Sequence, residues 1–390
     1  MPDRMMCVDE QRSAPDLRGL RVLIAHDWLV AWAGSERCVD EMLRIFPDAD
    51  LVAGVVAPSM RQFNAMTRRA EETWLARLPG ARTHHRWFLP LEGLAFASLD
   101  TRKYDLIISS SHAFSKMVRR GPHAVHVCYC YSPPRYLWDL SATYRRDARG
   151  IQRLALVGAL GGLRRMDRWS ARGVDHFISI SRYIADRVQR CYGRRADVVY
   201  PPVTAKPWSG PMYPRENFIL SLGRLVPYKR VDLIVQAAER LGVRLVVAGD
   251  GPDRSRLEAL AGPHTEFVGA VSEEAAAKLF STCAAFVFCA EEDFGIAPVE
   301  ANAHGAPVVG FGRGGLLETM RQDVTAEFFY EQTVDAVADA IERTLSRSWQ
   351  GAELRANAER FSPVAFRRDF IRSIEMALGT QAQHEAVALA

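Results

Sequence analysis

The sequence has 390 residues, of which 48% are hydrophobic and 25% charged, values that exclude a disordered or fibrous chain. The length leaves room for two domains that each bury a core. The net charge of +4 is unevenly spread: residues 1–200 hold 31 Lys+Arg against 21 Asp+Glu, and the remainder holds 19 against 25. The N-terminal half therefore carries +10 and should attract an anionic partner, such as a membrane surface, a diphosphate-bearing lipid or nucleic acid.

Seven cysteines show neither a Cys-x-x-Cys pair nor a regular spacing, which indicates no zinc site and no disulfide framework. A reducing cytosol is the simplest compartment for such a chain. The first 18 residues are polar, and no apolar run reaches 18 residues, so we expect neither a signal peptide nor a spanning helix. The expected location is the cytoplasm, with peripheral contact to the inner face of the cytoplasmic membrane left open.

After a tail over residues 1–18, an alternation of strands and helices is predicted for a first domain at 19–205. Gly34 to Glu36 open a helix in which Val39, Leu43 and Phe46 recur at helical spacing. The expected strands lie at 21–26, 51–56, 105–109, 125–129, 176–180 and 198–200. This alternation is typical of a doubly wound parallel sheet.

A second series of alternating elements follows a stretch that is typical of a hinge. Residues 201–214 contain five prolines and little periodic apolar pattern. The second domain, at 206–360, has expected strands at 218–222, 243–248, 265–268, 284–288 and 307–309. Two Rossmann-like α/β units in tandem predict a cleft at the carboxyl ends of their strands, where ligands bind. The final segment, 361–390, is expected to hold a helix at about 362–378 and a loose tail.

Two carboxylates, Glu292 and Glu300, stand eight positions apart at a strand-to-helix junction. The apolar run 284–289 predicts a buried strand and the small residues after Val299 a helix, so Gly295 lies where a helix begins. That end of a helix offers free N–H groups to a phosphate, and glycine lets the backbone come close. Carboxylates beside an anion suit neutral hydroxyls, which predicts a nucleotide-sugar site. The alternative is a capping acid and a solvated helix residue.

Two cations stand five residues apart just after the first strand of the second domain, in the segment from Gly223 to Lys229. Arg224 can grip phosphate oxygens with two parallel bonds, and Lys229 adds a point charge. A loop with two solvated cations is the alternative. Gly249 follows the next strand and is explained by turn chemistry, with a nucleotide contact as a second interpretation.

These segments resemble the C-terminal signature of retaining nucleotide-sugar glycosyltransferases of the two-Rossmann (GT-B) type, family 4. Besides the two glutamates and the Gly-Arg…Lys segment, the matching positions are Phe294-Gly295, Ala303-x-Gly305-x-Pro307 and Gly314-Gly315-x-x-Glu318. The resemblance implies two Rossmann-like domains facing a central cleft, and a C-terminal helix that crosses back to brace the first domain.

The resemblance also implies roles for the residues at these positions. Glu292 would hold hydroxyls of the transferred sugar, and Glu300 would hold the ribose. Arg224, Lys229 and the backbone at Phe294, Gly295 and Ile296 would stabilise the departing diphosphate without a metal or other cofactor. The front-face reaction proposed for the family needs no protein nucleophile, because the leaving phosphate takes the proton of the acceptor.

In the first domain, His112 ends a predicted strand at the cleft, where the family also places a histidine. A histidine there can bind a sugar hydroxyl or respond to charge at the reacting carbon, although a lone histidine is more often structural. Gly34 and Ser35 lie in the first strand-to-helix loop and are predicted to contact the donor phosphate or the acceptor. The family more commonly has a Gly-Gly pair in this loop, and Ala33 is a departure.

The segment from His126 to Asp139 is rich in rings and includes Tyr131 and Arg135, which suit a groove that stacks sugars and pairs with an anion. Together with 26–30 and 109–116 it resembles the subgroup that builds O-antigens and exopolysaccharides by mannosyl transfer. Many members have histidine where Tyr131 stands. The alternative interpretation is an aromatic core loop.

Two further patterns imitate known motifs. Gly310-x-Gly312-x-x-Gly315 matches a dinucleotide fingerprint but follows the last strong strand, so we interpret it as a turn. Asp48-Ala49-Asp50 resembles the metal-binding Asp-x-Asp motif, but its place at a helix end favours a solvated turn, and no metal site is predicted.

An apolar run at 154–163 is followed by Arg164, Arg165 and Arg168. It is too short to span a bilayer and predicts either a helix in the membrane interface, with the arginines on lipid phosphates, or a helix packed on the sheet.

The sequence thus predicts a metal-independent retaining glycosyltransferase that moves a hexose, mannose from GDP-mannose, to a glycan acceptor on a polyprenyl diphosphate lipid. Nucleic acid is not an expected partner. The alternatives are a UDP-sugar-dependent enzyme of the same fold, an epimerase of nucleotide-sugars and a non-catalytic glycan-binding subunit.

Overall fold

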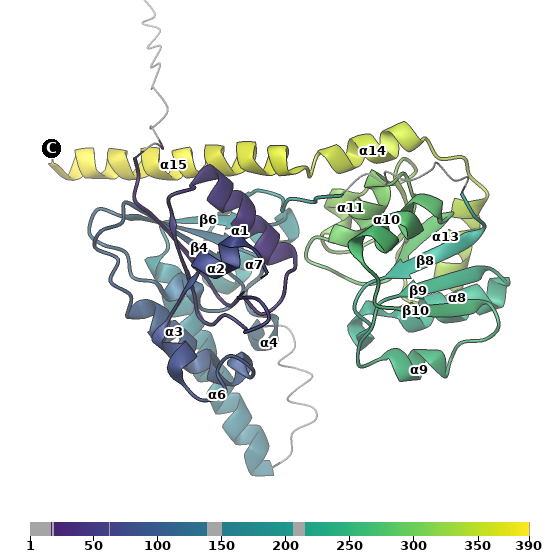
Figure 1. The fold of residues 1–390 in the computed structure, drawn as a ribbon, viewed down its shortest axis with the longest axis horizontal. Coiled ribbons are helices and arrows are strands. Elements are labelled where there is room, and N and C mark those ends of the chain that lie inside the picture. The colour runs from purple at the N-terminus through teal and green to yellow at the C-terminus, as the bar shows by residue number, and fades with distance from the viewer. Residues whose placement is uncertain (1–16, 18, 62, 139–149, 206–214, 390) are drawn as a thin grey trace, which may run out of the picture.

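A computed structural model describes residues 17, 19–61, 63–138, 150–205 and 215–389, and shows two α/β domains, each built on one sheet (Figure 1). All pairings between the named strands are parallel. The prediction of two doubly wound, Rossmann-like units is therefore confirmed.

The first sheet has the order β3-β2-β1-β4-β5-β6-β7. Its strands are β1 (Val22–His26), β2 (Asp50–Ala53), β3 (Glu71–Glu72), β4 (Leu106–Ser111), β5 (Val125–Cys130), β6 (His176–Ser179) and β7 (Ala196–Val198). Its α-helices are α1 (Gly34–Ile45), α2 (Ala65–Arg69), α3 (Leu89–Ala97), α4 (Arg135–Trp138), α6 (Gly150–Ser170) and α7 (Arg182–Tyr192). The two-residue edge strand β3 has no sequence signal, and β7 lies two residues before the predicted 198–200.

The second sheet has the order β10-β9-β8-β11-β12-β13. Its strands are β8 (Phe218–Leu222), β9 (Arg244–Ala248), β10 (Thr265–Gly269), β11 (Ala285–Phe288), β12 (Val308–Phe311) and β13 (Ala326–Phe329). The helices after β8 are α8 (Val231–Leu241), α9 (Arg254–Glu258), α10 (Glu273–Thr282), α11 (Ile296–Ala303), α12 (Leu316–Thr319), α13 (Val334–Leu345), α14 (Gly351–Glu359) and α15 (Pro363–Leu389). Strand β13 was not predicted.

The strand order of each sheet places the site. Strand β1 lies between β2 and β4, and β8 lies between β9 and β11, so connections diverge to both sides of these strands. A crevice forms at such a switch point, at the carboxyl ends of the strands. The loops after β1, β4, β8 and β11 therefore meet where the two domains face each other.

Helix α15 leaves the second domain and lies along the first, where it contacts α1 and β5 (Figure 1). Phe366 and Phe370 pack edge-on against Tyr129 of β5, with ring centroids 5.8 and 5.9 Å apart. The helix extends to Leu389, so the prediction of a loose tail after residue 378 was wrong.

The start of α7 is bonded to the second domain. The carboxylate of Glu318 accepts hydrogen bonds from the backbone N–H groups of Arg182 (2.7 Å) and Tyr183 (2.8 Å), the first two residues of α7. The hydroxyl of Ser181 donates to the carbonyl of Asp293 at 2.7 Å. A helix start needs acceptors for its free N–H groups, and here one of them comes from the other domain.

Several predicted features lie outside the described residues, namely nearly all of the tail at 1–18 and the hinge residues 206–214. Within the described part of the chain, no helix combines the length and the apolar character needed to cross a bilayer.

Candidate active site in the cleft between the domains

A cleft of about 800 Å³ lies between the two domains and collects most of the predicted site residues. The predicted residues that line it are His112, Tyr131, Arg135, Gly223, Lys229, Glu292, Phe294, Gly295, Ile296 and Glu300. Trp28, Leu89 and Asp293 line it as well. A second cavity of about 840 Å³, lined by Arg215, His304 and Trp349 among others, contains none of the predicted site residues.

Helix α11 begins at the cleft, at Ile296, directly after Gly295, where the sequence predicted a helix start. Gly295 immediately precedes it and has a φ of 88°, a left-handed conformation that favours glycine. The loop of the first domain approaches this point, because a Cβ on Gly34 would lie 2.6 Å from the Cδ1 of Ile296. A side chain at Gly34 would therefore displace the end of the Ile296 side chain at the start of α11.

Lys229, predicted to stabilise the diphosphate, and Glu292, predicted to hold the sugar, face each other in the cleft. The Nζ of Lys229 is 3.8 Å from an Oε1 of Glu292. Burial raises the pKa of Glu292, and the positive charge of Lys229 opposes this shift. The cleft therefore holds a cation and a carboxylate side by side.

Two predicted donor-binding residues do not line this cleft. The exposed Arg224 lines a small adjoining cavity together with Gly223 and Lys229. Gly249 follows β9 and packs against the backbone of Gly223. Arg224 therefore lies beside the cleft, and Gly249 has a sufficient explanation in its packing on Gly223.

Glu300, the residue predicted to hold the ribose, is paired with the first domain. Its Oε1 lies 3.3 Å from a guanidinium nitrogen of Arg37 on α1, and Arg37 also bonds Glu273 of α10 at 3.1 Å. Burial raises the pKa of Glu300, and Arg37 opposes the shift. Arg37 was not predicted as a site residue, since nothing in its local sequence points to a partner 263 residues away.

This shift predicts that nucleotide affinity depends on pH. Because the pKa of Glu300 is raised, its carboxylate takes a proton at a higher pH than an ordinary glutamate does. If Glu300 holds the ribose as predicted, the charge available to ribose hydroxyls is lost as pH falls through that pKa. Calorimetry with a nucleoside diphosphate from about pH 8 to about pH 5 should show weakening affinity. Glu300→Gln should bind more weakly throughout and lose much of the dependence, and an unchanged pH profile would remove Glu300 from the site.

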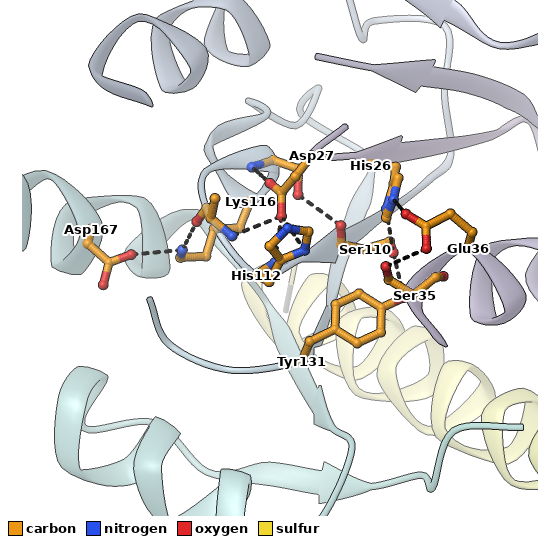
Figure 2. Close-up of polar contacts among 11 residues, drawn as sticks. His26, Asp27, Ser35, Glu36, Ser110, His112, Lys116, Tyr131 and Asp167 are labelled. Carbon is orange, nitrogen blue, oxygen red and sulfur yellow. Dashed lines mark hydrogen bonds and ion pairs between the residues drawn. The ribbon is translucent and has the colours of Figure 1, made fainter. Parts of the chain in front are cut away.

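His112 follows β4, and its ring and backbone N–H contact the carboxylate of Asp27, which follows β1 (Figure 2). The buried carboxylate of Asp27 accepts backbone N–H groups of His112, Ala113 and Ser115 and lies 3.2 Å from the Nδ1 of His112. Burial alone would raise the pKa of Asp27, but His112 and these donors outweigh it and lower the pKa. An ionised Asp27 places the His112 proton on Nδ1 and leaves Nε2 as an acceptor.

A second network holds the Gly34–Ser35 loop (Figure 2). The carboxylate of Glu36 accepts from the N–H of Ala33 (3.0 Å) and the hydroxyl of Ser35 (2.9 Å). The hydroxyl of Tyr131 donates to the carbonyl of Ser35 at 3.0 Å. Ala33 has a φ of −141°, an extended conformation that any residue adopts, so its departure from glycine leaves the loop intact. Tyr131 thus braces the loop and lines the cleft.

The arginines that follow the apolar run of α6 are partly engaged within the protein. The Nε of Arg164 donates to the carbonyl of Leu137 at 2.6 Å, and Arg168 lies 4.9 Å over the ring of Trp138. These contacts favour a helix packed on the domain for this part of α6, and only Arg165 among the three has no contact of this kind in the described structure. The side chains at 154–159 lie outside the described residues.

The Asp48-Ala49-Asp50 segment and the glycine pattern from Gly310 to Gly315, which imitate a metal motif and a dinucleotide fingerprint, both have structural explanations. Asp50 begins β2, at the end of the sheet opposite the cleft, and bonds Lys103 (2.8 Å) and Tyr104 (2.7 Å). Gly315 follows β12 and donates its N–H to the carbonyl of Glu292 at 2.8 Å, which supports the loop that carries the glutamate. Among the described residues, no three His, Cys, Asp or Glu side chains are grouped to hold a metal ion.

Comparison with known proteins finds a family match over most of the second domain. Residues 203–361 match the family model Glycosyl transferases group 1. The matched region includes Lys229, Glu292, Gly295 and Glu300, which line the second-domain side of the cleft.

Curated relatives match over part of their length. A "GDP-mannose-dependent alpha-mannosyltransferase" of Mycobacterium tuberculosis is 35% identical over 155 residues, which cover 40% of this chain and 35% of the relative. A "D-inositol 3-phosphate glycosyltransferase" of Mycobacterium leprae is 33% identical over 153 residues, covering 36% and 35%. The chain thus spans about a third of the length of the curated relatives it matches.

Solved structures match over nearly the whole chain. Anabaena Alr3699/HepE in complex with UDP-glucose superimposes with a TM-score of 0.66 at 16% identity, covering 91% of this chain and 99% of the other. The lipopolysaccharide outer core galactosyltransferase WaaB in its apo form gives 0.63 at 16% identity, with the same coverage. These likenesses confirm the predicted GT-B fold.

Proposed function

We propose that the protein is a retaining glycosyltransferase that transfers a hexose from a nucleotide-sugar to a glycan acceptor. The observation that carries this proposal is the convergence of Lys229, Glu292, Glu300 and the start of α11 on one cleft between the domains. A cation and helix N–H groups suit a diphosphate, and carboxylates on either side suit the hydroxyls of the sugar and the ribose.

In the proposed reaction the protein chiefly stabilises the leaving nucleoside diphosphate. Lys229 and the N–H groups at the start of α11 would meet charge that grows as the sugar bond breaks. Glu292 would orient the hexose, Glu300 the ribose, and the Nε2 of His112 would accept a hydrogen bond from a sugar or acceptor hydroxyl. The leaving phosphate would take the proton of the acceptor.

We propose GDP-mannose as the donor, supported by the relative named as a GDP-mannose-dependent alpha-mannosyltransferase. A UDP-sugar is the second candidate, because the Anabaena structure holds UDP-glucose. Incubation with a panel of nucleotide-sugars, scoring slow hydrolysis and product inhibition, should single out one donor. Failure of every donor to be hydrolysed or bound would overturn the proposed function.

We propose that the acceptor is a glycan carried on a polyprenyl diphosphate lipid, in the assembly of a surface polysaccharide. The +10 charge of residues 1–200 would attract the lipid diphosphate and an anionic membrane. Arg135 stands on the first-domain side of the cleft, where it could meet an acceptor phosphate.

Activity should not require a divalent metal. Lys229 and the start of α11 stand where an ion would otherwise neutralise the diphosphate. Transfer measured with EDTA should equal transfer without it. Activity that is lost in EDTA and restored by Mg²⁺ or Mn²⁺ would contradict the expectation.

A further inference from the structure

Helix α3 is apolar on both of its sides, although one side faces solvent. Its inner residues Ala95 and Phe96 are fully buried. On the outer side, Trp87, Leu91 and Leu94 are 80%, 37% and 54% exposed. The 3₁₀ turn His85–Phe88 runs directly into α3, and the spacing of four and three residues puts these side chains on one side, called here the α3 face.

No charge interrupts the α3 face. Glu92 is the one acidic residue between Thr73 and Leu99, and it is buried on the inner side. Burial and the negative charge of Asp27 raise the pKa of Glu92 well above that of an ordinary glutamate, which disfavours a charge on this helix. A helix that is apolar all round is normally covered on every side.

The segment of sequence that carries the α3 face is basic. The same stretch of sequence holds Arg77, Arg82 and Arg86 and two histidines. Arg77 is exposed, whereas Arg82 pairs with Glu72 at 2.7 Å. Exposed tryptophan and leucine beside arginine is the composition of a helix that lies in the interface of an anionic membrane.

The position of α3 links this face to the site. Leu89, its first residue, lines the cleft between the domains. Helix α15 lies at the far side of the first domain (Figure 1). A membrane on the α3 face would therefore lie at the mouth of the cleft, on the side of the first domain.

Building on the lipid-linked acceptor proposed above, we propose that the α3 face inserts Trp87, Leu91 and Leu94 into the interface of an anionic phospholipid membrane. The neighbouring arginines meet the lipid phosphates, and the cleft opens toward the membrane surface. The acceptor then reaches the cleft without leaving the bilayer.

The test is flotation of the full chain with vesicles of phosphatidylcholine alone or mixed with phosphatidylglycerol. The wild-type protein should bind the mixed vesicles and dissociate from them as the salt concentration rises. The pair Leu91→Ser and Leu94→Ser should weaken binding about tenfold or more, with the residual binding still sensitive to salt. The matched control is Val364→Ser with Met376→Ser on α15, at residues 67% and 52% exposed, and it should bind like wild type.

A second readout does not depend on affinity. Brominated lipids should quench the fluorescence of Trp87 on binding, and Trp87→Phe should lose that quenching while still floating with vesicles. Equal binding by the α3 and α15 variants would overturn the proposal. So would a dimer in the absence of lipid that the α3 substitutions convert to a monomer, because the occupant would then be a second copy.

Donor hydrolysis without vesicles separates this proposal from the proposed function. The α3 variants should hydrolyse the donor as fast as wild type. If wild type hydrolyses no nucleotide-sugar, the glycosyltransferase proposal fails, while flotation still decides whether the α3 face binds membrane.

Discussion

Asp27→Asn should lower the free energy of unfolding by about 2–4 kcal/mol and reduce turnover on the order of 100-fold. The buried carboxylate of Asp27 accepts three backbone N–H groups and faces the Nδ1 of His112. Asparagine supplies a single acceptor oxygen and turns an NH₂ group toward these donors. Turnover should fall because His112 loses the partner that fixes its proton.

Urea unfolding and steady-state kinetics check both effects. The stabilisation from Asp27 should vary with pH: its folded pKa is lowered, so the contribution is present above the unfolded pKa and is lost as pH falls through the folded one. Asp105→Asn is the control, since Asp105 pairs with Arg21 at the surface and such pairs contribute little. An Asp27→Asn protein as stable as wild type would show that the loop after β4 does not depend on this carboxylate.

Lys229→Ala should lower kcat about 100-fold and weaken binding of the nucleoside diphosphate. Removing the ammonium takes away positive charge from the leaving diphosphate, and it also removes the larger of the two cationic contributions that oppose the rise in the pKa of Glu292. The loss should fall mainly on kcat, because the diphosphate charge grows toward the transition state.

Calorimetry and initial rates on the same preparation separate binding from turnover. Arg230→Ala is the matched control, as it removes a neighbouring cation that bonds Asp232 at 3.2 Å and does not line the cleft. Wild-type turnover in the Lys229 variant would place the diphosphate elsewhere, and Arg224 would then be the next cation to test.

Most helices and strands, and the second-domain side of the cleft, could be predicted because the sequence patterns that indicate them are local. Glu292, Gly295 and Glu300 fall within nine residues of one strand-to-helix junction, and the apolar run before them predicts the strand directly. The end of α15 was predicted too early, since the apolar periodicity fades before the helix does. Strand β13 was not predicted because Ala326 to Phe329 is only a short apolar run after a turn. Its strand conformation is fixed by pairing with β12.

The other wall of the cleft depends on pairings that a local pattern does not encode. The N–H groups that Asp27 accepts lie 85 to 88 residues further along the chain. Arg37 and its partner Glu300 are separated by 263 residues. Each side chain taken alone is compatible with a solvated surface. Only the strand order, which brings the ends of β1 and β4 together, and the packing of the two domains select these partners.

Because Glu318 of the second domain caps the start of α7 in the first domain, separating the two domains removes this cap and weakens the first turn of α7. When the cleft widens, the N–H groups of Arg182 and Tyr183 lose the carboxylate that accepts them, and the first turn of α7 must find water instead. A lost helix cap typically costs about 1 kcal/mol. The protein is thus biased toward the arrangement in which the two domains touch, and hydrogen exchange at these two amides could follow their separation.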